Sequence, residues 1–150
     1  MKALSQALLA CAAAAAMAAL LAACETPRPS QEEMSGANFG PPPRFWKEDI
    51  LSYMKLRLKD PIGAVIDFRN EPKQLYQKQV GLDPEQHGWA VCLTVRDRNR
   101  AGAFEEAYPM TVFFRNEKIV AVNNGPENIG PAGFFYARQQ CKQLGTPFDQ

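Results

Sequence analysis

The sequence predicts an α+β domain: an antiparallel sheet of three to five strands flanked by an N-terminal and a C-terminal helix. Three observations support this class. Residues 45–61 carry apolar side chains at helical spacing, residues 64–122 contain several short runs typical of strands, and residues 134–144 return to helical spacing. A chain of 150 residues is long enough for one such domain.

The first predicted helix lies in "FWKEDILSYMKLRLKDP". Trp46, Ile50 and Leu58 fall near one face, with either Tyr53 or Met54 between them, and charged residues separate these apolar positions. Proline disfavours helical geometry in the residue before it, so Asp60-Pro61 should end this helix near Lys59.

The central part of the chain predicts a meander of strands. Residues 64–68 form a short β-like run, and residues 74–80 give a weaker signal. Residues 88–97 alternate clearly, but both alternating sets are largely apolar, which predicts a central strand covered at least partly on both faces. Residues 108–114 and 118–122 should form an antiparallel hairpin, because only three residues join them.

The C-terminal part predicts a loop and then a helix. Residues 123–133 are rich in Asn, Gly and Pro and should form a loop. Phe134, Ala137, Cys141 and Leu144 follow at helical spacing, and the next residue is a glycine suited to close a helix.

The N-terminus has the pattern of a secretory signal. Lys2 supplies a positive charge, and residues 7–23 contain nothing more polar than a cysteine. Leu21-Ala22-Ala23-Cys24 then resembles the lipobox of bacterial lipoproteins. The resemblance implies that residues 1–23 are a cleaved signal peptide and that Cys24 carries acyl chains. An ordinary secreted protein and an uncleaved membrane-spanning helix are the alternatives.

The resemblance also implies a location. Residue 25 is Glu rather than Asp, which by the sorting rule of enterobacterial lipoproteins implies the outer membrane. We therefore expect a lipid-anchored protein that faces the periplasm of a Gram-negative bacterium, with the membrane as its first partner.

Residues 24–44 comprise the lipidated cysteine and a predicted flexible tether. Residues 25–44 contain five prolines, two glycines and only two sizeable apolar side chains, so they should not bury enough surface to fold. Fully extended, twenty residues reach roughly 65 Å. Residues 45–150 should form the single folded domain.

The domain contains two cysteines, Cys92 and Cys141, since Cys11 falls in the leader. An exported protein favours a disulfide, and both positions plausibly face one sheet–helix interface. A metal site would need more ligands than the single histidine offers, and a redox pair is usually C-x-x-C, which is absent. No cofactor motif occurs, so we expect neither metal nor cofactor.

A second resemblance covers about residues 45–145. "LKDPIGAV", "GWAVCLTVRDRN" and the late Cys141 resemble a recurrent small envelope domain of proteobacteria, although "RDRNRAGAF" departs from the Asn-rich loop of that family. The resemblance supports the fold and implies no activity.

The densest charge is "RDRNR", which contains Arg96, Arg98 and Arg100. At strand spacing the three side chains should point the same way and, with Phe104 and Tyr108, form a basic aromatic patch. Guanidinium groups bind phosphate or carboxylate, so the ligands could be lipid A, anionic lipid or peptidoglycan stems. The alternative is a solvated turn balanced by nearby acidic residues: Asp97, Glu105 and Glu106.

These observations predict a non-catalytic binding or assembly module of the cell envelope. Without Lys2 the chain carries 16 basic and 16 acidic side chains, so no overall field favours nucleic acid as a partner. A small hydrolase acting on cell-wall or lipid material is one alternative, and it should place His87 in a pocket with carboxylates. A purely structural envelope component is the other.

Overall fold

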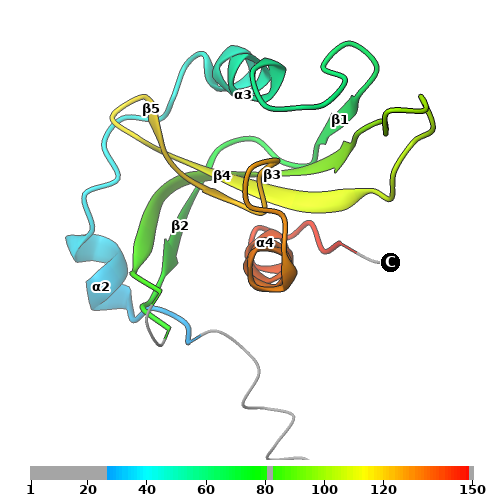
Figure 1. The fold of residues 1–150 in the computed structure, drawn as a ribbon. Coiled ribbons are helices and arrows are strands. Elements are labelled where there is room, and N and C mark those ends of the chain that lie inside the picture. The colour runs from blue at the N-terminus through cyan, green and yellow to red at the C-terminus, as the bar shows by residue number, and fades with distance from the viewer. Residues whose placement is uncertain (1–26, 81–82, 149–150) are drawn as a thin grey trace, which may run out of the picture.

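A computed structural model describes residues 27–80 and 83–148 of the chain. A five-stranded antiparallel sheet lies between two helices, which confirms the predicted α+β class (Figure 1). The elements in chain order are α2 (Gln31–Gly36), α3 (Trp46–Lys55), β1 (Val65–Phe68), β2 (Lys73–Gln77), β3 (Gln86–Arg96), β4 (Tyr108–Arg115), β5 (Lys118–Asn123) and α4 (Pro131–Gln143).

Strand β3 is the centre of the sheet. Its two halves pair with different strands along one edge: β2 lies beside residues 86–90 and β1 beside residues 93–96. Strand β4 pairs with the other edge of β3, and β5 pairs with β4. All of these pairings are antiparallel, so β1 and β2 lie end to end along β3.

The Asn70 side chain bridges the gap between β1 and β2. Its Nδ2 donates to the Ala90 carbonyl at 3.2 Å, and its Oδ1 accepts from the Cys92 N–H at 2.8 Å. These two bonds satisfy backbone groups of β3 at the end of its pairing with β2 and just beyond it.

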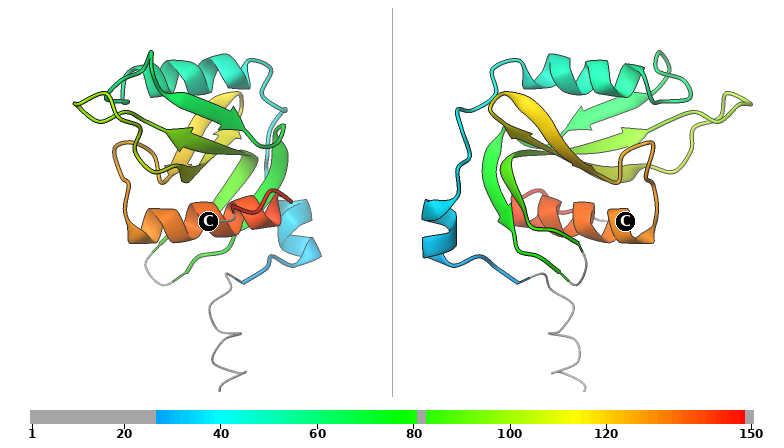
Figure 2. Two further views of the ribbon diagram at one scale, coloured as in Figure 1. Left: turned by 90° about the vertical axis from the view of Figure 1, so that its right-hand side faces the viewer. Right: turned by 60° about the vertical axis from the view of Figure 1, so that its left-hand side comes forward.

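Helices α3 and α4 cover opposite faces of the sheet (Figures 1 and 2). Alternate residues of β3 therefore enter two separate hydrophobic cores, as the apolar residues on both of its faces predict. The core under α3 contains Ile50, Met54, Leu58, Val91, Leu93, Val95, Tyr108, Met110, Val112 and Phe114. The core under α4 contains Leu75, Ala90, Cys92, Phe113, Cys141 and Leu144.

Helix α3 ends one turn earlier than the sequence predicts. The N–H groups of Arg57 and Leu58 both donate to the Met54 carbonyl, so the chain tightens after Lys55. Leu58 still reaches the core beneath α3. Burial of an apolar side chain thus continues beyond the helix itself, which is why the apolar spacing alone overestimates its length.

The β4–β5 hairpin turns over two residues rather than three. Asn116 and Glu117 have φ values of 51° and 60°, which suits the twist of an antiparallel hairpin. A register shift between Phe113 and Phe114 accommodates the pairing with β5. The hairpin itself was predicted correctly.

The flexible tether is the main correction to the sequence-based prediction. Ser30 and Glu33 form a capping box that begins α2. The hydrogen bond from the Ser30 N–H, followed by the hydrogen bond from Lys78, lowers the pKa of Glu33 to about 2. Further along, Phe39 is buried, and the Gly40 carbonyl accepts from Trp89 Nε1 at 3.0 Å. The described part of this segment is therefore packed against the domain, because its few apolar residues find partners on the sheet.

Cys92 and Cys141 form the predicted disulfide, which links the middle of β3 to α4. Their Cα atoms lie 5.4 Å apart, and the pair is separated by 49 positions in the sequence. On the chain-entropy model, closing such a loop stabilises the folded state by about 4 kcal/mol.

Gly88 allows the close approach of β3 and β4. A Cβ atom at this position would lie 2.4 Å from the Phe114 carbonyl oxygen, which is part of the sheet backbone. We expect Gly88→Ala to lower the free energy of unfolding by about 1–3 kcal/mol, measured by urea denaturation. Gly36→Ala is the control, since a Cβ there meets nothing within 4 Å. Equal stability of the two variants would contradict the predicted clash.

Candidate functional site

Arg96 and Arg98 converge on one exposed aromatic ring beyond the end of β3. Their Cζ atoms lie 5.2 and 4.5 Å from the centroid of Phe104, and 47% of Phe104 is exposed. Such distances are typical of cation–π contacts. We call these three residues the Arg-Phe cluster.

The loop between β3 and β4 holds the Arg-Phe cluster together. Arg98 and Phe104 form an isolated antiparallel bridge, which extends the pairing of the two strands. Between them, Asn99 Oδ1 accepts from the N–H groups of Ala101 and Ala103 at 3.0 and 3.1 Å. Gly102, with φ of 80°, completes the turn in a conformation that favours glycine.

Asp97 lies between the two arginines in sequence but turns its carboxylate inward. Only 4% of Asp97 is exposed. The carboxylate accepts from the backbone N–H groups of Lys59 at 3.0 Å, Asp60 at 3.3 Å and Arg98 at 2.7 Å. It therefore ties the chain after α3 to the loop that bears the Arg-Phe cluster.

Glu105 also pairs away from the two arginines. Its oxygens accept from Lys59 Nζ at 2.8 and 3.0 Å. Arg98 Nε is buried and has no hydrogen-bond partner among the described residues. Two of the three acidic residues that could balance the arginines thus have other partners.

The structure does not bring all of the predicted patch together. Arg100 lies in the exposed turn, and none of the cation–π contacts of the described residues joins it to Phe104. Tyr108 was expected in the patch but belongs to the core under α3. Burial, and then the charges of Asp97 and Glu105, raise the pKa of Tyr108 well above its usual range.

His87 lies beside a hollow of about 330 Å³. Arg115 Nη1 donates to His87 Nε2 at 2.9 Å, and the imidazole ring stacks on Tyr76. Glu85 Oε1 lies 4.0 Å from His87 Nδ1. His87 therefore does meet a carboxylate beside a hollow, although no Ser, Thr or Cys is among the described residues that line it.

Four amide side chains link α4 to three strands, and sequence periodicity did not reveal them. Gln140 Nε2 donates to Gln77 Oε1, and Asn123 Nδ2 donates to Gln140 Oε1 at 2.9 Å. Asn123 also exchanges hydrogen bonds with Gln86. Because Gln140 is fully buried, these bonds fix the orientation of α4 on the sheet.

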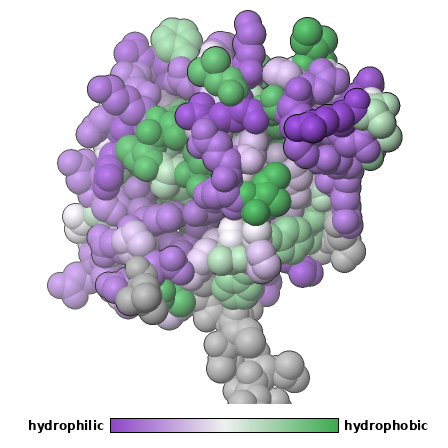
Figure 3. Space-filling view, viewed as in Figure 1, coloured by the Kyte–Doolittle hydropathy of each residue, from purple (hydrophilic) through white to green (hydrophobic). Residues whose placement is uncertain are grey.

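Two larger hollows lie along α4, and nothing in the sequence pattern predicted either of them. They have volumes of about 470 and 530 Å³. The signal that could have indicated this region is that α4 carries basic residues but no acidic one. On the face shown in Figure 3, apolar residues form separate patches among hydrophilic ones.

The predicted lipidation site Cys24 and the signal peptide 1–23 lie outside the described residues. Within residues 27–80 and 83–148, no helix combines the length and apolar character needed to cross a membrane. The same part of the chain contains no group of three or more His, Cys, Asp or Glu side chains placed to bind a metal ion.

Comparison with known proteins gave no match to a family model, to a curated protein or to a solved structure.

Asp97 offers a test of how the Arg-Phe cluster is held. We expect Asp97→Ala to lower the free energy of unfolding by about 1–3 kcal/mol, because three backbone N–H groups lose their acceptor. Asp67→Ala is the control, since Asp67 is exposed and its closest basic atom, Arg69 Nε, is 3.9 Å away. Urea denaturation of both variants measures the difference. Similar losses would show that the Asp97 contacts do not hold the loop.

Proposed function

We propose that the mature chain is a lipid-anchored binding module of the cell envelope, which uses the Arg-Phe cluster to bind a phosphate or carboxylate group. The observation that carries this proposal is the convergence of two guanidinium groups on the exposed Phe104 ring. The role is binding or assembly on the periplasmic side of the outer membrane, without catalysis.

The chemistry of the Arg-Phe cluster suits such a ligand. A guanidinium group that rests on a ring face can still donate from its terminal nitrogens to an anionic group, and in Arg98 these are the nitrogens other than the buried Nε. Because Asp97 bonds to backbone and Glu105 bonds to Lys59, neither carboxylate occupies the arginines. The exposed ring adds an apolar contact for the part of the ligand next to its anionic group.

The sequence around Cys24 supports the anchor. A positively charged start, an apolar stretch and a lipobox-like tetrapeptide end at this cysteine. Each buried methylene contributes about 0.8 kcal/mol, so two or three acyl chains make anchoring effectively permanent. The Cys92–Cys141 disulfide is consistent with an oxidising compartment such as the periplasm.

A small envelope hydrolase is the second candidate, and the hollow beside His87 favours it. His87 could act as a general base, and Arg115 could hold an anionic product. In the structure, however, Arg115 donates to Nε2, so this nitrogen becomes available only if that bond breaks. The Arg-Phe cluster needs no such rearrangement, and we therefore prefer the binding module.

The anchor can be tested by Cys24→Ala. We expect the variant to lose incorporation of radiolabelled palmitate and to leave the membrane fraction, because no thiol remains to be acylated. Cys11→Ala is the matched control and should behave like the parent protein. Unchanged membrane retention and electrophoretic mobility of Cys24→Ala would contradict lipidation at this residue.

The Arg-Phe cluster can be tested in the intact envelope by crosslinking and identification of the attached component. We expect R96S/R98S to reduce the yield of that adduct by about tenfold or more, because charge-assisted hydrogen bonds are lost. The control R69S/R100S removes the same charge from outside the cluster. Equal yields from both double variants would dismiss the cluster and favour a purely structural component.

A further inference from the structure

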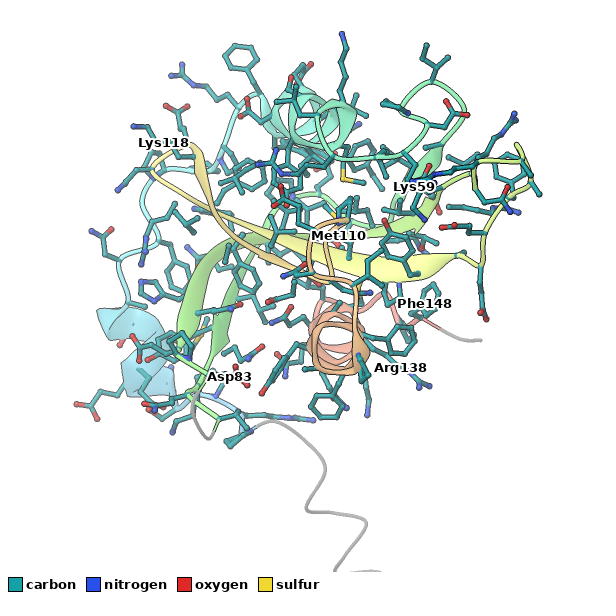
Figure 4. All side chains as sticks on the ribbon, in the orientation of Figure 1. Lys59, Asp83, Met110, Lys118, Arg138 and Phe148 are labelled. Atoms are coloured by element: carbon teal, nitrogen blue, oxygen red, sulfur yellow. A yellow bond between two sulfur atoms is a disulfide. The ribbon has the colours of Figure 1, made fainter. Side chains whose placement is uncertain are left out.

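The outer side of α4 combines basic and aromatic residues. Arg138 and Lys142 are exposed on this helix, and Figure 4 shows Arg138 on the side of α4 away from the sheet. Phe135, one turn earlier, is 39% exposed. All charged side chains of α4 are basic, since the helix contains no Asp or Glu.

Two hollows flank this side of α4, and Gln139 and Lys142 line both of them. The hollow between α4, β2 and the N-terminal segment is also lined by Arg28 and Met34. The hollow on the other side is also lined by Phe135, Arg138, Pro147 and Phe148. No acidic residue is among the described residues that line either hollow. The charged residues that line the two hollows are therefore all basic, while Asp83 accepts a hydrogen bond from Tyr136 elsewhere on α4.

The chain before α2 leads from this same side toward Cys24. Arg28 and Pro29 already lie against the domain, where they line the hollow beside α4. Four positions separate Arg28 from Cys24, which span at most about 14 Å. A lipid on Cys24 therefore keeps this hollow close to the bilayer, whereas a free tether of twenty residues would not.

We propose that the outer side of α4, together with Arg28, rests on the anionic phospholipid headgroups of the membrane that holds Cys24. The proposal rests on the lipid anchor of the proposed function. Arg28, Arg138 and Lys142 supply charge that complements the headgroup phosphates, and Phe135 supplies an aromatic ring at the depth where such rings are favoured.

This contact gives the domain a fixed orientation. Each basic residue near an anionic surface strengthens binding by about fivefold, and the acyl chains hold the surface at high local concentration. Helix α3, on the opposite face of the sheet, is then turned away from the bilayer (Figure 2). The Arg-Phe cluster, on the loop between β3 and β4, remains open to a separate ligand.

Fluorescence quenching by brominated lipids tests this orientation. The lipidated full mature protein is reconstituted into phosphatidylcholine vesicles with about 30% phosphatidylglycerol, with and without bromine in the acyl chains. We expect F135W to lose about half of its added fluorescence in brominated vesicles, after subtraction of the parent signal. L56W is the control, because Leu56 follows α3 and is 81% exposed. The L56W variant should lose less than about a tenth of its added fluorescence.

Charge variants test the role of the headgroups. R138E/K142E in the F135W chain should reduce quenching to the level of L56W, whereas R69E/R100E, with the same change of net charge, should leave it unchanged. Vesicles of phosphatidylcholine alone should also abolish it. Quenching that is equal at residues 135 and 56, or that survives either R138E/K142E or removal of phosphatidylglycerol, would overturn the proposal. Absence of quenching at residue 135 would also overturn the proposal. The outer side of α4 would then face a protein partner or solvent.

The mass of the N-terminal peptide from the same sample separates this inference from the anchor. Acylated Cys24 without quenching at residue 135 would retain the anchor and overturn the docking of α4. An unacylated chain that still shows selective quenching, when added to the same vesicles, would refute the anchor and support the docking surface.

Discussion

Strand β3 carries apolar side chains on both of its faces, and the sheet must therefore be covered twice. Val91, Leu93 and Val95 enter the core under α3, while Ala90 and Cys92 enter the core under α4. Every other strand pairs with β3 or with a strand that does, so both helices pack against a sheet built around this one strand. If either helix detached, the apolar side chains on that face of the sheet would be exposed to water and their burial energy would be lost. The sheet therefore needs a helix on each face.

Helix α4 is attached to this sheet in three ways. Ala137, Cys141 and Leu144 are buried, the disulfide fixes the helix to β3, and Gln140 bonds to amides from β2 and β5. With its inner side so constrained, the helix cannot turn its basic outer side inward. That outer side thus becomes a permanent surface feature, available for contact with the membrane in the proposed orientation.

Basic and acidic residues are unevenly distributed over the surface of this protein. Basic and acidic residues nearly cancel over the whole chain, yet Asp97 is buried against backbone N–H groups and Glu105 is paired with Lys59. These two carboxylates therefore do not pair with the side chains of the arginines at Phe104, and the charged side chains of α4 are all basic. Two such groups of basic residues on different parts of the domain are compatible with one contact to lipid and another to an envelope ligand, because a domain held close to the bilayer can use both at once.

The sequence by itself determined the fold class, the central strand with two buried faces, the hairpin and the pairing of Cys92 with Cys141, because these depend on local periodicity and on the number of cysteines. It also grouped Arg96 and Arg98 with Phe104, and these three side chains do lie together. Only the tertiary structure decided that Arg100 and Tyr108 lie outside the cluster, since a turn and a core position separated residues that alternate in sequence. The packing of residues 39 and 40 was likewise invisible, because their partners on β3, His87 and Trp89, are distant in the chain. Composition alone therefore predicted a tether, whereas long-range contacts hold the described part of this segment against the domain.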